Sequence, residues 1–265
     1  MVKLIVCDMD GTFVGKSEEL PKDASRYIQK LEKAGIGFTV ATGRSDGYME
    51  ERIEKMQLKR PYIANNGATI MQGRTALMRK QFPIKGLREI AELAHERGFS
   101  IIYTFAGKER VTEITPWIIH EGEKHGHPFT AAPFTEEEWE TLKVDKVLVY
   151  DETRSGRIGE IEAMCPSVCE ASFVRYGDKA VELMEKTANK ASGLVELCRI
   201  LSVSTEDVLA IGDDTNDVEL FRLAGASAAV ANGKPAAKAC AKYICKNEEF
   251  EGVKEAVGIF CGVEL

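Results

Sequence analysis

KLIVCDMDGTF, residues 3–13, is the stretch of sequence that decides the fold. Its residues 4–7 form a short apolar run, which is typical of a strand that is buried on both faces. Asp8 and Asp10 follow directly, and Gly11 comes after them. A strand that belongs in the core therefore ends by presenting two carboxylates at one point.

Strand and helix patterns alternate on the C-terminal side of this stretch and again in the last part of the chain. Short β-branched or apolar runs alternate with amphipathic segments, as in the strand at residues 36–42 and the helix at residues 45–56. Ser45 is a suitable N-cap for that helix, and Asn66 with Gly67 predicts a turn. Apolar strands that alternate with helices favour a parallel sheet covered on both faces. We therefore predict an α/β fold with a doubly wound, mainly parallel, Rossmann-like core.

The middle of the chain has a different pattern. Residues 82–185 contain an amphipathic helix, paired strand candidates and further short helices, which together indicate an α+β arrangement. This block lies between the two runs of alternating strands and helices. We predict that it is a separate domain inserted into a core formed by residues 1–81 and 186–265.

Composition excludes several classes of protein. The chain has 265 residues, is 44% hydrophobic and carries a formal charge of −7 without a basic block. We expect no nucleic-acid partner, because such a partner requires a basic patch that neutralises phosphates. No apolar run approaches the ~18 residues of a membrane span, and a signal peptide pattern is absent, so we expect a cytoplasmic protein without a membrane partner. Nothing in the sequence indicates an oligomeric state.

Cysteine and histidine do not form a metal pattern. The seven cysteines are scattered, contain no CxxC pair, and several sit in apolar segments, so free packed thiols are expected. Cys7, next to Asp8, is expected to face the opposite side of its strand. His120, His125 and His127 lie among charged residues, which favours a solvated surface over a metal site.

Four segments place polar residues where ligands bind in an open α/β sheet, beyond the carboxyl ends of its strands. They are CDMDGT (7–12), ATGRS (41–45), ANKAS (188–192) and GDDTND (212–217). If the strands are neighbours, Asp8, Asp10 and Asp213 converge, together with Asp214 or Asp217.

Such a convergence requires cations. Two unit charges ~4 Å apart repel by about 4 kcal/mol at an effective dielectric constant of about 20. Lys190 is the only lysine in the four segments, and a divalent ion is the other obvious source of positive charge. Oxygen ligands without histidine or cysteine select a hard ion, and Mg²⁺ suits a site that also holds a phosphate.

The remaining residues suit a phosphoryl group. Gly11 and Gly43 allow backbone N–H groups to approach an anion, and Thr42 and Asn216 add neutral donors. A carboxylate in line with the phosphorus is a nucleophile that divides hydrolysis into two displacements. A second carboxylate can donate a proton to the leaving oxygen and later accept one from water.

The motifs DMDGT, ATGR, a lysine that opens a helix, and GDDTND resemble, in this order and spacing, those of the haloacid dehalogenase superfamily. The position of the insert, between the second and third motifs, resembles the Cof-type (subclass IIB) sugar-phosphate phosphatases. The resemblance implies a phosphatase that requires Mg²⁺ and acts on small phosphorylated metabolites, either sugar phosphates or related compounds. It also implies that the inserted domain is a cap that covers the active site and determines specificity.

The resemblance assigns the catalytic and metal-binding roles. Asp8 is the nucleophile that becomes an aspartyl phosphate, and Asp10 is the general acid and base. Asp8, Asp213 and the main-chain carbonyl of Asp10 are the protein's ligands to Mg²⁺. Lys190 counters charge on the phosphoryl group and on Asp8.

It also assigns the residues around the phosphate. Thr42 and the Gly43 N–H are expected to bind phosphoryl oxygens, and Asn216 to contact substrate or phosphate. Arg44 is expected either to bind substrate or to pair with the acidic loop. The supporting residues are Thr12, which would steer Asp10, Asp217, which would orient Lys190 or a metal-bound water, and Asp214.

Three alternatives to hydrolysis stay open. A phosphomutase of the same fold would return the phosphoryl group to its substrate. A receiver domain also carries a phosphorylated aspartate on a parallel sheet, but it lacks the insert and the second aspartate at the +2 position. A regulator that only binds sugar phosphates would be expected to lose Asp8 or Asp10, and both are present.

Overall fold

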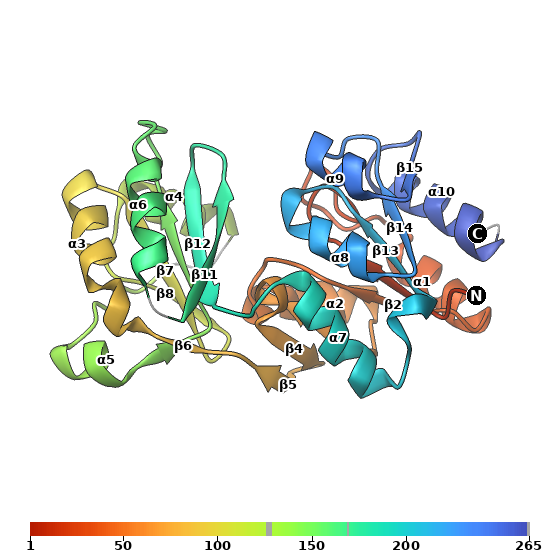
Figure 1. The fold of residues 1–265 in the computed structure, drawn as a ribbon, viewed down its shortest axis with the longest axis horizontal. Helices are drawn as coiled ribbons and strands as arrows, with labels where there is room; N and C mark the ends of the chain where they lie inside the picture. The colour runs from red at the N-terminus through yellow and green to blue at the C-terminus, as the bar shows by residue number, and fades with distance from the viewer. Residues whose placement is uncertain (126–128, 169, 264–265) are drawn as a thin grey trace. The chain divides into compact units, whose positions relative to one another are not determined.

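The computed structural model of the protein describes residues 1–125, 129–168 and 170–263 (Figure 1). The chain forms two compact units. Met1–Met78 and Asn189–Leu265 make up the first, here called the core unit. Arg79–Ala188 make up the second, here called the inserted unit.

The core unit is built on a parallel sheet with the strand order β15-β14-β13-β1-β2. Its central strand is β1, which pairs with β13 on one side and β2 on the other. The strands are β1 (Leu4–Cys7), β2 (Gly37–Val40), β13 (Val208–Gly212), β14 (Ala226–Ala229) and β15 (Tyr243–Ile244). This parallel sheet confirms the predicted α/β core.

Helices cover both faces of this sheet, as a doubly wound fold requires. Along β1, Ile5 and Cys7 belong to one apolar cluster, and Leu4 and Val6 belong to another. The first cluster includes residues of α1 (Ala24–Lys33), α2 (Asp46–Met56) and α10 (Glu249–Cys261). The second includes residues of α7 (Lys190–Leu201), α8 (Val218–Leu223) and α9 (Pro235–Cys240).

A second, small sheet follows α2. Its three strands are β3 (Tyr62–Ala64), β4 (Thr69–Gln72) and β5 (Thr75–Arg79). A single parallel bridge between Ala41 and Ile63 joins β3 to the chain beyond β2. The turn η1 (Asn65–Gly67) connects β3 to β4, so the expected Asn-Gly turn is present.

The inserted unit contains an antiparallel sheet with the order β11-β12-β10-β7-β8. One face packs against α3 and α6, and the other carries α4. The strands are β7 (Ser100–Phe105), β8 (Lys108–Val111), β10 (Lys146–Tyr150), β11 (Ala171–Tyr176) and β12 (Ala180–Glu185). The other elements are β6 (Phe82–Pro83), β9 (Lys143–Val144), α3 (Arg88–Arg97), α4 (Pro116–His125), α5 (Glu136–Thr141) and α6 (Ile158–Met164).

The boundaries of the units lie slightly outside residues 82 and 185, the limits expected from the sequence. Arg79 and Gln81 donate to the buried carboxylate of Asp145, at 2.7 and 3.0 Å, and so belong with the inserted unit. At the other end, the carbonyl of Ala188 accepts a hydrogen bond from Ser172 at 3.4 Å. In the described part of the chain, no helix combines the length and apolar character needed to cross a membrane.

Candidate active site

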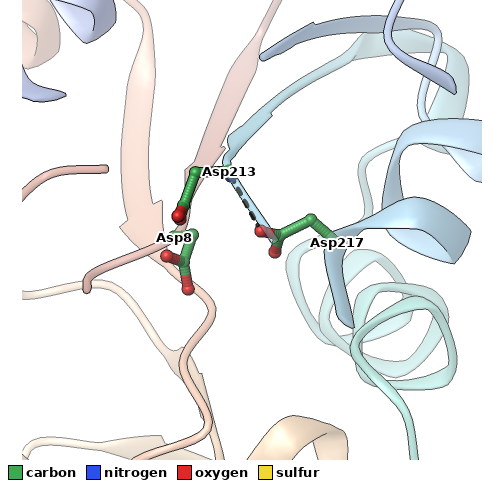
Figure 2. A group of neighbouring side chains, drawn as sticks. All are labelled: Asp8, Asp213 and Asp217. Atoms are coloured by element: carbon green, nitrogen blue, oxygen red, sulfur yellow. Dashed lines mark hydrogen bonds between the residues drawn. The ribbon is translucent and has the colours of Figure 1, made fainter. Parts of the chain in front are cut away.

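Three carboxylates meet beyond the carboxyl ends of β1 and β13. Asp8 directly follows β1, Asp213 directly follows β13, and the Asp8 N–H donates to the carbonyl of Ile211 at 2.8 Å. Asp217 comes from the turn η5 (Thr215–Asp217) that precedes α8. Each of the three aspartates offers a carboxylate oxygen within 4.8 Å of the others, and Figure 2 shows the side chains gathered in one place. Parallel pairing of two neighbouring strands therefore creates the cluster.

Lys190 is the cation of this cluster. It is the first residue of α7, and the side chain of Asn189 caps that helix by accepting from the Ser192 N–H. The Lys190 Nζ lies 2.5 Å from Asp8 Oδ1 and 2.6 Å from Asp217 Oδ1. Its side chain is completely buried, so one ammonium group faces three carboxylates.

The pKa values reflect this imbalance. Burial raises the pKa of Asp8 well above its ordinary value; Lys190 opposes the shift, and the charges of Asp217 and Asp213 add to it. Burial also raises the pKa of Asp213 to about 6, although a hydrogen bond from Thr12 opposes the change. Burial disfavours the charge of Lys190, but Asp217 and Asp8 outweigh that effect and raise its pKa. The cluster therefore has less positive charge than its carboxylates require.

The donor set fits a hard divalent cation, because all three groups are carboxylates. Both oxygens of Asp217 already have partners. Oδ1 accepts from Lys190 at 2.6 Å. Oδ2 accepts from the Asp213 N–H at 3.0 Å, the bond drawn in Figure 2, and from the Asp214 N–H at 3.0 Å. Asp8 has one oxygen bonded to Lys190, and Asp213 has one bonded to Thr12. Asp8 and Asp213 are thus better placed than Asp217 to take a metal.

Asp10 lies outside the group of three. Its side chain is 44% exposed, and Arg44 donates to both of its oxygens, from Nε at 2.6 Å and from Nη2 at 2.5 Å. The Arg44 guanidinium also lies 4.3 Å from the ring centre of Tyr48. Arg44 therefore pairs with Asp10 of the DMDGT motif, and its role in substrate binding stays a prediction.

The turn after β1 depends on Gly11, which has a φ of +82°. A Cβ at this position would lie 2.6 Å from Asp213 Oδ2, so no larger residue fits without a shift. The Thr12 hydroxyl donates to Asp213 Oδ1 at 2.8 Å. The turn thus directs the Thr12 hydroxyl toward Asp213, whereas the resemblance led us to expect a hydrogen bond with Asp10.

The expected phosphate-binding segment follows β2. Thr42 is buried; its N–H donates to the carbonyl of Ile63 at 2.9 Å, and its hydroxyl accepts from the Arg44 N–H at 3.1 Å. A Cβ on Gly43 would lie 3.0 Å from the Nδ2 of Asn66. The Nδ2 of Asn216 donates to the Oδ1 of Asn66 at 2.9 Å.

Asp214 does not belong to the group of three carboxylates. Its side chain caps the turn η5 by accepting from the Thr215 N–H, and it also accepts from the Nζ of Lys234 at 2.6 Å. Burial alone would raise the pKa of Asp214, but the hydrogen bonds from Lys234 and Thr215 lower it. Asn232 also reaches this region, donating from its Nδ2 to the carbonyl of Gly11 at 2.7 Å.

Lys234, Asn232 and Asn66 were not among the predicted site residues. A usable signal was present for each, since Asn66 follows β3, and Asn232 and Lys234 follow β14. Polar residues just beyond the carboxyl end of a strand are candidates for a site in this type of fold.

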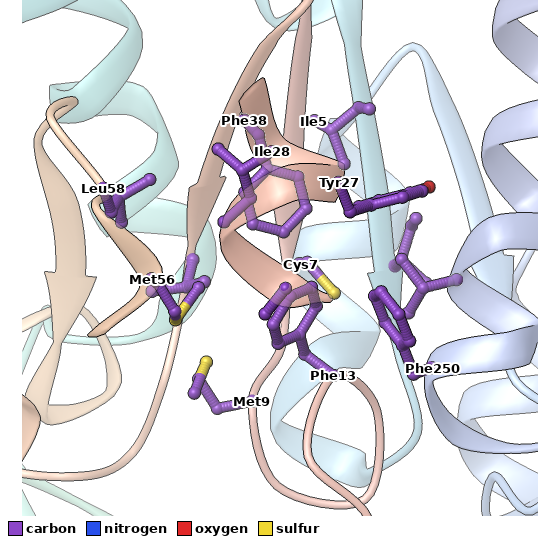
Figure 3. Packing of buried hydrophobic residues seen from close by; sticks show 14 of the residues in the cluster. Ile5, Cys7, Met9, Phe13, Tyr27, Ile28, Phe38, Met56, Leu58 and Phe250 are labelled. Atoms are coloured by element: carbon purple, nitrogen blue, oxygen red, sulfur yellow. The ribbon is translucent and has the colours of Figure 1, made fainter. Parts of the chain in front are cut away.

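The opposite side of β1 is purely structural. Figure 3 shows Cys7 packed beside Phe13 and Phe250, whose ring centres are 5.0 Å apart. Burial raises the pKa of the Cys7 thiol well above its ordinary value.

Of the histidines, His120 is exposed on α4, whereas His127 lies outside the described residues.

Comparison with known proteins gives the family. The model of the haloacid dehalogenase-like hydrolases matches residues 5–257. A protein of Mycoplasma pneumoniae, named as a candidate phosphatase, is 28% identical over 279 residues, covering 99% of each chain. A phosphoglycolate phosphatase of Methanopyrus kandleri is 28% identical over 255 residues, covering 96% of this chain and 94% of its own.

Comparison of structures agrees with this result. The solved structure of the subclass IIB sugar phosphatase BT4131 has the same fold, with a TM-score of 0.84 and 20% identity, over 99% of this chain and 100% of that one. The family match extends over both parts of the core unit and the whole inserted unit. The chain therefore belongs to the haloacid dehalogenase-like hydrolases, in which it is a Cof-type phosphatase.

Proposed function

We propose that this phosphatase is a Mg²⁺-dependent phosphomonoesterase that acts through an aspartyl phosphate on Asp8. Its substrates are small phosphorylated metabolites, either sugar phosphates or related compounds. The observation that carries this proposal is the cluster of Asp8, Asp213 and Asp217 around Lys190, in which Asp8, Asp217 and the lysine are buried. The names of a phosphoglycolate phosphatase and a sugar phosphatase among similar proteins support the substrate class.

The carboxylates of Asp8 and Asp213, with the main-chain carbonyl of Asp10, would hold the Mg²⁺. When bound, the ion supplies the positive charge that lets a phosphate dianion approach ionised carboxylates. Asp217 instead holds Lys190 and the N–H groups of residues 213 and 214 in place.

In the first displacement, an oxygen of Asp8 bonds to the phosphorus while the bond to the leaving oxygen breaks. Asp10 gives a proton to that oxygen, so the product leaves as an alcohol. Because Arg44 holds both oxygens of Asp10, it must release one of them before Asp10 can carry this proton. Thr42, the Gly43 N–H and Asn216 bind the oxygens of the phosphoryl group, and Lys190 balances their charge.

In the second displacement, a water molecule bonds to the same phosphorus. Asp10, now ionised, accepts a proton from that water, and the bond between Asp8 and the phosphorus breaks. The products are inorganic phosphate and the original Asp8 carboxylate. One side chain thus acts as acid and then as base, which requires the exposed position that Asp10 occupies.

The inserted unit is proposed to act as a cap domain that determines substrate specificity. This proposal is supported by the location of the site residues, since every residue assigned a catalytic, metal-binding or phosphate-binding role belongs to the core unit.

The proposed compartment is the cytoplasm. The free thiols of Cys7, Cys165, Cys198 and Cys245 suit it, because disulfides are rare there.

A screen of phosphorylated metabolites with added Mg²⁺, followed by the release of inorganic phosphate, tests the proposal. We expect hydrolysis of several small sugar phosphates or phosphorylated acids by the wild-type protein and none by Asp8→Asn. Wild-type protein that releases no phosphate from any compound would overturn it. Equal rates in the variant would overturn the role of Asp8.

A further inference from the structure

The Asn-Gly turn at Asn65–Gly67 has no role in the proposed mechanism, yet it contacts the segment that follows β2. The Asn66 N–H donates to the carbonyl of Thr42 at 2.9 Å, and the Asn65 N–H donates to the carbonyl of Arg44 at 2.9 Å. In return, the Thr42 N–H donates to the carbonyl of Ile63, just before the turn. These three bonds fix the backbone on both sides of Gly43.

The side chain of Asn66 contacts two residues proposed to bind phosphate. Its Oδ1 accepts from the Nδ2 of Asn216 at 2.9 Å, across 150 residues of sequence. Its Nδ2 lies close to Gly43, because a Cβ added at Gly43 would be only 3.0 Å from this nitrogen. Asn66 is 1% exposed, so its amide fills the space between these two residues rather than facing solvent.

The same turn lies against the start of α7, which carries Lys190. A Cβ on Gly67 would lie 2.0 Å from the carbonyl oxygen of Asn189, and the φ of Gly67 is +95°. Only glycine allows this approach. The turn therefore contacts segments that provide Thr42 and Gly43, Asn216, and Lys190.

The backbone of the turn is held in an uncommon conformation. Asn65 and Asn66 both have a φ of 49°, in the left-handed region that asparagine tolerates better than most residues. The Nδ2 of Asn65 donates to Asp46 Oδ1 at 3.2 Å and to Thr69 Oγ1 at 3.1 Å, which anchors the turn. Strained backbone that the surrounding structure maintains is a feature of functional sites.

We propose that Asn66 is a positioning residue of the phosphate site, which aims the amide of Asn216 at the phosphoryl group. One hydrogen of the Asn216 Nδ2 is committed to Asn66, and this bond fixes the plane of the amide and the direction of its second hydrogen. Without Asn66, the amide of Asn216 rotates, and a bound phosphate loses an oriented donor. The inference rests on the proposed role of Asn216 in phosphate binding.

The test uses Asn66→Gly, which removes the side chain and keeps a residue that accepts a positive φ. Ser202→Gly is the matched control, because Ser202 has a φ of 53° and is the exposed C-cap of α7. Hydrolysis of p-nitrophenyl phosphate and its inhibition by inorganic phosphate are measured for wild type, Asn66→Gly, Asn216→Ala, the double variant and the control. A thermal midpoint for each protein establishes that it is folded.

We expect Asn66→Gly to weaken inhibition by phosphate about tenfold and to lower kcat/KM by a similar factor, as the loss of one oriented polar contact does. Asn216→Ala should weaken inhibition by phosphate and lower kcat/KM by the same factors. The double variant should show no larger changes than Asn216→Ala alone, since Asn66 acts through Asn216. The control should match wild type. If Asn66→Gly does not fold, Asn66→Ser, whose shorter side chain cannot span to Asn216, takes its place with the same expected result.

Losses that multiply in the double variant would overturn the inference, because Asn66 would then act independently of Asn216. Wild-type inhibition and kcat/KM in Asn66→Gly would overturn it as well. An equal loss in Ser202→Gly would do the same, because the effect would not depend on the site. These outcomes all require an active wild-type enzyme, whereas wild-type protein that releases no nitrophenol would instead count against the proposed function.

Discussion

The two units bury carboxylates in opposite ways. In the core unit, Asp8 is buried and Asp213 is half-buried beside other carboxylates, and the pKa values of both are raised. In the inserted unit, Asp151 is also fully buried, but it accepts four hydrogen bonds from the backbone and hydroxyl groups of Thr153 and Ser155, at 2.6 to 3.1 Å. Burial alone would raise the pKa of Asp151, yet these bonds outweigh it and lower the pKa.

Other buried carboxylates of the inserted unit also have hydrogen-bond donors or a cation beside them. Asp145 accepts from Arg79 and Gln81, and Glu182 pairs with Lys146 at 3.0 Å. A carboxylate that is supplied with enough donors stabilises the fold. Carboxylates that are buried together with too few cations destabilise it, and such clusters characterise functional sites. The contrast predicts different results for mutations in the two units.

The largest effect is expected for Asp8→Asn. The amide is a poor nucleophile, so turnover should fall by about 10⁴-fold or more, and no protein-bound phosphate should form. The thermal midpoint should not fall, because the change removes one of three neighbouring negative charges. Rapid-quench measurement of protein-bound phosphate and a melting curve test both parts. Protein-bound phosphate in this variant would show that the two carboxylates of the DMDGT motif have been assigned in the wrong order.

Removal of the metal should have the next largest effect. We expect exhaustive treatment with EDTA to abolish hydrolysis and added Mg²⁺ to restore it, because Lys190 alone cannot balance the cluster. Asp213→Asn should weaken Mg²⁺ binding and activity together, as measured by activity against Mg²⁺ concentration. Full activity after chelation would contradict the proposed site. Unchanged Mg²⁺ affinity with reduced activity would give Asp213 another role.

Asp10→Asn should lose less than Asp8→Asn when the leaving group needs no proton. With p-nitrophenyl phosphate, the first displacement should survive, because nitrophenolate leaves without protonation. The second should slow by about 10²–10⁴-fold, because no base remains to activate water. Protein-bound phosphate should therefore accumulate in this variant. Its absence during continued turnover would show that another residue acts as the base.

Much of the core unit was predictable from sequence because its pattern is local. The run from Leu4 to Cys7 has the composition of a doubly buried strand, and its neighbours β13 and β2 have the same character. The convergence of Asp8 with Asp213 follows from parallel pairing alone, since both residues directly follow their strands. Ser45 caps α2 as expected, by accepting from the Tyr48 N–H.

The hydrogen-bond partners of individual side chains in the turns and loops were not predictable. The direction of the Thr12 hydroxyl depends on the geometry of the turn at Gly11, and the pairing of Arg44 with Asp10 joins residues 34 positions apart. The bond between Asn66 and Asn216 depends on how two separate turns meet. For the same reason, the buried charges of the inserted unit left no recognisable motif, because hydrogen-bonding partners for a structural carboxylate can come from many residue types.

The smallest effect, limited to stability, is expected for Asp151→Asn in the inserted unit. Its amide cannot accept all four hydrogen bonds, so we expect the free energy of unfolding at pH 7 to fall by about 1–3 kcal/mol. Activity per folded molecule should stay within about twofold, because Asp151 has no role in the proposed chemistry and its hydrogen bonds contribute to stability. Glu152→Gln removes the same charge from the adjacent, partly exposed position and should change stability by less than about 0.5 kcal/mol.

The dependence of this effect on pH separates a satisfied carboxylate from a merely buried one. Because the pKa of Asp151 is lower in the folded protein than in the unfolded chain, its contribution is fully present above the unfolded value of about 3.9 and disappears as the pH falls through the folded value. The difference in unfolding free energy between wild type and Asp151→Asn should therefore be constant from pH 7 to about pH 5 and shrink below about pH 4. Urea denaturation at each pH measures it. A difference that grows as the pH falls would mean that the hydrogen bonds to Asp151 do not offset its burial, and the contrast between the two units would fail.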